Sequence, residues 1–153
     1  MVNLSAFVKP GLAQVLFISI TAITDGQSFS PFSIHNFTKQ TYKAENQNWS
    51  ITEDNKSSIY AANNIGLLEF DGIDWTFYPS PNGTIIRSVA VGADNRIFTS
   101  GYRELGYWER DALGTLNYHS LNKNAESFFN SNEEFWTIIV NESKVYLDRK
   151  SVV

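Results

Sequence analysis

The sequence predicts an all-β protein made of repeated antiparallel sheets, and three observations support this. Short apolar segments rich in aromatic and β-branched residues alternate with turns of Asp, Asn and Gly. Aromatic residues make up 14% of the chain, and long apolar runs with a helical period are absent after Ile23. The same strand-and-turn unit also returns after about 40 residues.

The clearest unit runs from Asn48 to about Tyr78 and contains four predicted strands. Between the third and fourth strands, Asp71 and Gly72 predict a hairpin turn, because an Asp-Gly pair accommodates left-handed backbone. Four short strands in about 35 residues match the size of one β-propeller blade. The predicted strands are Trp49–Ile51, Ile59–Ala61, Leu67–Phe70 and Trp75–Tyr78.

This unit recurs along the chain. A shift of 38 residues aligns Arg87 with Trp49, and two inserted residues later Gly106 aligns with Gly66. A third copy begins near Phe135, where Trp136 matches Trp49. Such repetition favours a β-propeller, with an ordinary β-sandwich as the alternative.

The N-terminal residues have another character. Lys9 precedes an uncharged apolar run of 12 residues from Leu12 to Ile23. This run is shorter than the ~20 residues that a membrane-spanning helix needs, and it is typical of a secretory signal peptide. We expect cleavage after Gly26, or else after Thr24. A buried helix is the alternative, but the terminal position favours export.

The C-terminal residues 148–153 show no strand pattern and resemble the translation of a sequencing-adapter oligonucleotide. We therefore expect this tail to be non-native and the natural protein to continue; a short charged native tail is the alternative. About 2.5 units are too few to close a propeller, so we expect the chain to fold poorly by itself.

These observations divide the chain into six parts. Within the second part, Ile34–Phe37 is predicted to form a short strand, and Leu121–Asn132 is predicted to be a long polar loop. The parts are a signal peptide (1–26), a lead-in segment (27–47), a first blade (48–82), a second blade (83–121), the start of a third blade (122–147) and the tail (148–153).

Composition excludes several functions. Without residues 1–26 and 148–153, the chain has 9 basic and 14 acidic side chains in an even distribution, which gives no basic patch for nucleic acid. Cysteine is absent, and His35 and His119 lack the spacing of metal ligands. No nucleophile elbow or phosphate-binding loop occurs. We therefore predict no catalytic residues, no metal and no cofactor.

Several stretches together resemble the blades of the two-component regulator propeller family. They are Gln47–Trp49, Asn63–Gly72, Ile86–Ser88 and Glu104–Trp108, and the resemblance covers roughly Phe32 to Tyr146. Ser57-Ser58 departs from the Asp-Gly type of turn usual there, and Thr99-Ser100 departs from a Gly-rich strand end.

The resemblance implies the periplasmic sensor region of a bacterial triple-tyrosine/helix-turn-helix or hybrid histidine-kinase regulator. In that family the propeller is followed by a triple-tyrosine domain, a membrane helix and a cytoplasmic output domain. The implied partners are an extracellular small molecule or oligosaccharide, the rest of the full-length chain, and a second copy in a homodimer. The implied location is the periplasm, with the full-length protein anchored in the inner membrane.

Polar residues near the strand ends are the candidate ligand site, because loops on one face of a propeller gather there. Arg87, Tyr102 and Glu104 are the candidate ligand-binding residues, and a surface ion pair or turn role is the alternative for each. The predicted structural residues are Trp49, Gly66, Asp71, Gly72, Trp75, Gly106, Trp108 and Trp136, with the tryptophans packing between blades.

The function predicted from these residues is a non-enzymatic ligand sensor for signal transduction. A secreted propeller enzyme acting on polysaccharide is one alternative, and it would need clustered acid and base residues. An extracellular scaffold or adhesion propeller is the other.

Overall fold

The computed structural model describes residues 33–124, 134–142 and 144–149 and divides into two units, Met1–His35 and Asn36–Val153. In the first unit only residues 33–35 are described, where the ring of His35 shares a hydrogen bond with the Ser33 hydroxyl. The predicted signal peptide, 1–26, lies outside the described residues. Within the described ranges, no helix is long and apolar enough to cross a membrane.

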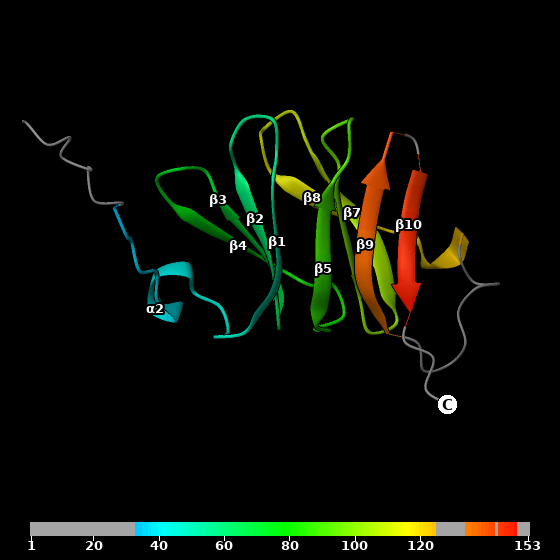
Figure 1. Ribbon diagram of the computed structural model, residues 1–153, viewed down its shortest axis with the longest axis horizontal. Coiled ribbons are helices and arrows are strands. Elements are labelled where there is room, and N and C mark those ends of the chain that lie inside the picture. The colour runs from blue at the N-terminus through cyan, green and yellow to red at the C-terminus, as the bar shows by residue number, and fades with distance from the viewer. Residues whose placement is uncertain (1–32, 125–133, 143, 150–153) are drawn as a thin grey trace, which may run out of the picture. The chain divides into compact units, whose positions relative to one another are not determined.

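The second unit is almost entirely β-structure, which confirms the all-β prediction (Figure 1). Two four-stranded antiparallel sheets are each formed by strands in chain order, and a two-stranded hairpin follows. The first sheet contains β1 (Asn48–Glu53), β2 (Ile59–Asn63), β3 (Gly66–Phe70) and β4 (Trp75–Pro79). The second contains β5 (Ile86–Val91), β6 (Ile97–Gly101), β7 (Glu104–Arg110) and β8 (Leu116–Ser120). The β9–β10 hairpin contains β9 (Phe135–Asn141) and β10 (Lys144–Arg149).

Acidic residues form the hairpin turns at one end of both sheets. In each turn a carboxylate oxygen accepts backbone N–H groups two to four residues further on, as Asp side chains do in tight turns. These residues are Asp54, Asp71, Asp94 and Asp111. The short turns keep consecutive strands adjacent, which produces the meander order of each sheet.

The first strands of successive sheets lie side by side: β1 is next to β5, and β5 is next to β9 (Figure 1). Apolar side chains of the first and second sheets form one continuous core. Because side chains alternate along a strand, each sheet presents one apolar face to its neighbour. The buried residues of this core are Tyr60, Ala62, Leu67, Ile86, Val89, Ile97, Trp108 and Leu116.

A serine hydroxyl links each first strand to the next one. The Ser50 hydroxyl accepts a hydrogen bond from the backbone N–H of Val89 at 3.4 Å. The Ser88 hydroxyl accepts one from the backbone N–H of Ile138 at 3.0 Å. Ser50 and Ser88 occupy the same position in β1 and β5, so the two interfaces are built alike.

At the turn end of the sheets, Arg110 of β7 forms an ion pair with Glu69 of β3. Glu69 is buried and also accepts hydrogen bonds from the hydroxyls of Tyr60 at 3.2 Å and Tyr78 at 2.9 Å. Burial, together with the nearby Glu69 carboxylate, raises the pKa of Tyr60. This network joins the first two sheets at the end opposite to the beginnings of β1 and β5.

The lead-in segment covers part of the outer face of the first sheet. Its short helix α2 (Lys39–Tyr42) places Tyr42 against Ala61 and Leu68. Trp75 contacts Tyr42 and Phe37, at centroid distances of 6.0 and 5.5 Å. Trp75 therefore packs against the lead-in segment, whereas the sequence predicted packing between blades.

Three further predictions were wrong in detail. Residues Ile34–Phe37 form no strand, although Phe37 packs on Phe70 of β3. The pair Gly101–Glu104 closes its hairpin as Asn63–Gly66 does, so Glu104 and not Gly106 is equivalent to Gly66. Finally, β10 continues through residues 148 and 149, where no strand was expected, because these residues pair with β9. Of the predicted loop 121–132, residues 125–132 lie outside the described ranges.

Candidate functional site

Each first strand contains one extra residue, a β-bulge, near its beginning. The pairing with the second strand skips Trp49 in β1, Arg87 in β5 and Trp136 in β9. A bulge redirects its side chain away from the regular alternation of the strand. These three bulged residues, named here the bulge cluster, therefore project at the same end of three neighbouring strands.

Arg87 lies between the two tryptophans of the bulge cluster. Its guanidinium carbon is 3.9 Å from the ring centroid of Trp49 and 4.5 Å from that of Trp136. The two indole rings are 6.0 Å apart and nearly perpendicular, at 89°. A guanidinium held against indole faces is stabilised by cation–π attraction, which is stronger when the cation is shielded from water.

The positive charge of Arg87 is balanced by Glu134. The Arg87 Nε donates to the Glu134 carboxylate at 2.5 Å, and the two side chains are only 13% and 23% exposed. The Arg87 Nη1 is buried without a hydrogen-bond partner, so the indole faces provide much of its remaining stabilisation. The site thus carries no net charge.

Solvent reaches the outer parts of both indoles. Trp49 is 39% exposed and Trp136 is 36% exposed. The orientation of Trp49 is fixed by a hydrogen bond of 2.8 Å from its Nε1 to the Asn64 side-chain oxygen. The cluster therefore presents two oriented aromatic surfaces to a ligand.

Tyr102 lies next to this cluster. It forms an isolated antiparallel bridge with Glu134, the partner of Arg87. Its side chain is 42% exposed. Two of the three predicted ligand-binding residues, Arg87 and Tyr102, are thus connected through Glu134.

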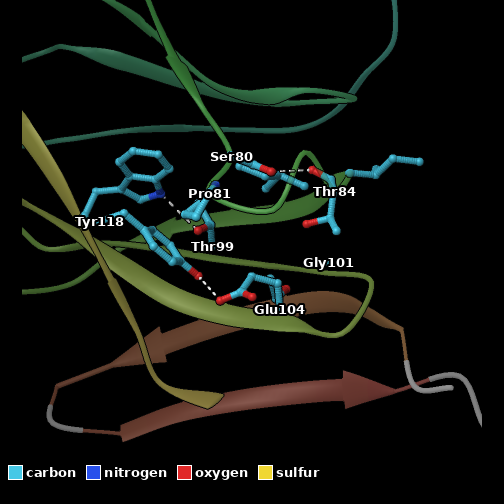
Figure 2. Close-up of a pocket in the computed structure, with 11 residues that line it drawn as sticks. Ser80, Pro81, Thr84, Thr99, Gly101, Glu104 and Tyr118 are labelled. Atoms are coloured by element: carbon cyan, nitrogen blue, oxygen red, sulfur yellow. Dashed lines mark hydrogen bonds between the residues drawn. The ribbon is translucent and has the colours of Figure 1, made fainter. Parts of the chain in front are cut away.

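Glu104 has a different environment from Arg87 and Tyr102. It is buried, and its carboxylate accepts four hydrogen bonds from neighbouring loops and strands, one of which is visible in Figure 2. The donors are Tyr118 at 2.7 Å, Ser120 at 2.9 Å, Asn82 at 2.7 Å and Asn122 at 3.0 Å. Burial, and then the Glu104 carboxylate, raise the pKa of Tyr118. The arrangement gives Glu104 a structural role, while contact with a ligand stays a prediction for all three residues.

A small cavity of about 10 Å³ lies beside Glu104 (Figure 2). Its lining includes the hydroxyls of Thr84 and Ser100, both buried without a hydrogen-bond partner. A volume of this size holds about one water molecule. It is therefore too small for an organic ligand, which leaves the bulge cluster as the stronger candidate.

The predicted structural glycines lie where a side chain would collide. A Cβ on Gly66 would be 2.1 Å from the Tyr78 carbonyl oxygen, and one on Gly106 would be 2.2 Å from the Tyr118 hydroxyl. Gly72 follows Asp71 with a φ of +100°, which L-residues rarely adopt. Trp108 is buried in the core between the sheets and packs 5.9 Å from the ring of Tyr78.

Sequence reasoning missed Glu134. The acidic pair Glu133-Glu134 was expected to be solvated, but Glu134 is partly buried and bonded to Arg87. One sequence signal could have identified it: this acidic residue directly precedes β9, in the repeat that follows the single arginine at a bulge position.

Comparisons with family models, curated proteins and solved structures find no match to this chain. The functional proposal therefore rests on its own sequence and geometry.

Proposed function

We propose that this chain is a non-catalytic, ligand-sensing β-propeller module of a bacterial signal-transduction regulator, facing the periplasm. Two successive four-stranded meanders with adjacent first strands are consistent with neighbouring propeller blades. The observation that carries the proposal is the bulge cluster, because the same bulge in three successive units directs its side chain to one end of the sheets.

The chemistry of the cluster favours a neutral hydroxylated ligand such as an oligosaccharide. Glu134 already neutralises Arg87, so an anion would have to displace a short, partly buried ion pair. The exposed indole surfaces of Trp49 and Trp136 suit stacking with the apolar face of a sugar ring. The exposed Tyr102 hydroxyl supplies a hydrogen-bonding group at the rim.

In this proposal residues 1–26 direct export, and the binding signal passes to the rest of the full-length chain. That remainder comprises further blades, the triple-tyrosine domain, a membrane helix and an output domain, as the family resemblance implies. Homodimerisation of the full-length protein would then transmit the ligand-bound state.

Tryptophan fluorescence tests ligand binding directly. We expect titration with a panel of neutral oligosaccharides, namely malto-, cello-, laminari- and xylohexaose, to change the emission of the chain with at least one member. Replacing Trp49 or Trp136 with Ala should weaken that binding by about tenfold or more, because stacking on an aromatic ring contributes about 1–2 kcal/mol.

The Trp75→Phe variant is the matched control, since Trp75 packs against the lead-in segment. It should bind like the unmodified chain. Equal loss in Trp75→Phe and Trp49→Ala, or no binding by any oligosaccharide of the panel, would contradict the proposed site.

Export is tested separately by fusing residues 1–47 to alkaline phosphatase, which is active only in an oxidising compartment. We expect activity in a Gram-negative host, and its loss when Leu16 and Phe17 are both replaced with Asp, since charges interrupt the apolar run of a signal peptide. An inactive fusion of the unaltered segment would contradict periplasmic location without affecting the binding site.

A further inference from the structure

The β9–β10 hairpin has a second apolar face. Ile138 is buried, and β9 packs on β5 and β6 of the second sheet. Because side chains alternate, Thr137 and Ile139 point to the opposite face, where Ile139 pairs with Tyr146. Ile139 and Tyr146 are 58% and 52% exposed. Within the described residues this face is therefore open to a partner.

The two interfaces already present show what such a face receives. In each, the hydroxyl that follows the bulged residue accepts a backbone N–H from the next first strand: Ser50 from Val89, and Ser88 from Ile138. Thr137 follows the bulged Trp136 and holds the same position in β9. Its hydroxyl is thus placed to accept the N–H of a further first strand.

The first sheet carries the complementary surface. Ile51 occupies in β1 the position of Val89 and Ile138, and it is 69% exposed. Beside it lies a groove of about 310 Å³, lined by β1 together with Ala61 and Trp75. The first sheet therefore offers, unfilled, the side that the second sheet and the hairpin turn toward their preceding neighbours.

We propose that the open face of the β9–β10 hairpin binds the first sheet of a second copy of this chain, head to tail. In this contact the Thr137 hydroxyl accepts the backbone N–H of Ile51 of the other copy. The inference goes beyond the proposed function and needs only the repeated interface. It continues an interface that the chain already forms twice, with the same hydroxyl, bulge and strand order.

A head-to-tail contact uses two different surfaces, so each copy keeps one of each for another contact. Two copies related by a twofold axis satisfy both contacts at once and close a ring of repeated sheets. The exposed Ile51, Ile139 and Tyr146 would then be covered in the same step, which supplies the apolar burial that stabilises association.

Cysteine cross-linking tests the contact cleanly, because the chain contains no cysteine. We expect the single variants Ile51→Cys and Thr137→Cys, when mixed and oxidised, to form a mixed disulfide dimer that a reductant dissolves. Leu113→Cys, at a turn residue that is 92% exposed, replaces Ile51→Cys in the control mixture and should give no selective product with Thr137→Cys.

Two outcomes would overturn the proposal. One is a mixed dimer with Leu113→Cys as abundant as that with Ile51→Cys. The other is preferential pairing of Thr137→Cys with itself, which would indicate a face-to-face contact.

The hydroxyl is tested by Thr137→Val and its matched control Thr137→Ser. Serine keeps the acceptor that Ser50 and Ser88 provide in the existing interfaces. We expect Thr137→Val to weaken self-association, measured by sedimentation equilibrium, about fivefold, as loss of one hydrogen bond does. Thr137→Ser should associate like the unmodified chain. Equal association of the valine and serine variants would refute the hydroxyl contact.

Discussion

Arg87 illustrates how one long side chain can connect strands that are far apart in the sequence. It contacts Trp49 of β1 and Trp136 of β9, and it pairs with Glu134. Its planar guanidinium can stack on indole faces while donating to a carboxylate, which a lysine ammonium cannot do equally well. Arg87 therefore orients the aromatic surfaces of the candidate site, whichever ligand those surfaces bind.

Ser57 shows a local conflict between sequence and backbone. It adopts a φ of 65°, although it has a Cβ and lies in the turn between β1 and β2. Replacing it with Gly should stabilise the chain by about 0.5–1 kcal/mol, because the relief of left-handed strain exceeds the added backbone entropy. Chemical denaturation measures this, with the neighbouring Ser58→Gly as the control. Stabilisation of the control to the same extent would show that turn strain is not the cause.

Asp71 makes a pH-dependent contribution to stability. Backbone hydrogen bonds from Asp74, and then from Ile73, lower the pKa of its carboxyl group below the ordinary value of 3.8. Because the pKa is lower in the folded state, the stabilisation is present above that ordinary value and is lost as the pH falls through the folded pKa.

The Asp71→Asn variant keeps an acceptor in the turn but cannot titrate. We expect the difference in unfolding free energy between the unmodified chain and this variant to shrink between about pH 6 and about pH 2.5. Denaturant titrations at several pH values measure it. A difference that grows on acidification would contradict the assigned sign.

The loops around β7 and β8 depend on the carboxylate of Glu104. Replacing Glu104 with Ala leaves four donors without their shared acceptor. We expect a loss of about 2–4 kcal/mol in unfolding free energy, since each buried group left without a partner is costly. Tyr118→Phe removes only one donor and should cost about 1 kcal/mol. Similar small losses in both variants, measured by chemical denaturation, would argue against this organising role.

Strand number, order and most hairpin turns could be predicted from the sequence, because local alternation and Asp-containing turns specify them. The register of the second unit could not. The shared glycine suggested equivalence of Gly66 with Gly106, yet the hairpin pairing makes Glu104 equivalent to Gly66. A two-residue ambiguity keeps the alternation of faces unchanged, so the apolar pattern alone cannot resolve it.

The candidate site was predicted only in part, because its contacts depend on bulges and on distant segments. Arg87 and Tyr102 were selected from their positions at strand ends. Glu134 was missed, since its pairing with Arg87 joins residues 47 positions apart. Trp49 and Trp136 were expected to pack between blades, but they also expose aromatic surface to solvent. A bulge leaves no clear mark in a single strand and becomes visible only when the partner strand is aligned.

At the level of the whole second unit, the first strands form the organising element. Repeated serine contacts join β1 to β5 and β5 to β9. The Glu69–Arg110 ion pair fixes the first two sheets at their other end. With both ends of the first interface linked, the position of Arg87 relative to Trp49 follows from the repeat of the sheets rather than from local sequence.

A double-mutant cycle between Trp49 and Arg87 tests this convergence most directly. The cycle compares the unfolding free energies of Trp49→Ala, Arg87→Ala, the double variant and the unmodified chain. We predict a favourable coupling of about 1–2 kcal/mol, because a shielded guanidinium lies on the indole face. The control cycle between Trp75 and Arg87 should give about zero. Coupling of about zero for Trp49 and Arg87 would contradict the meeting of the bulged residues, on which the proposed ligand site depends.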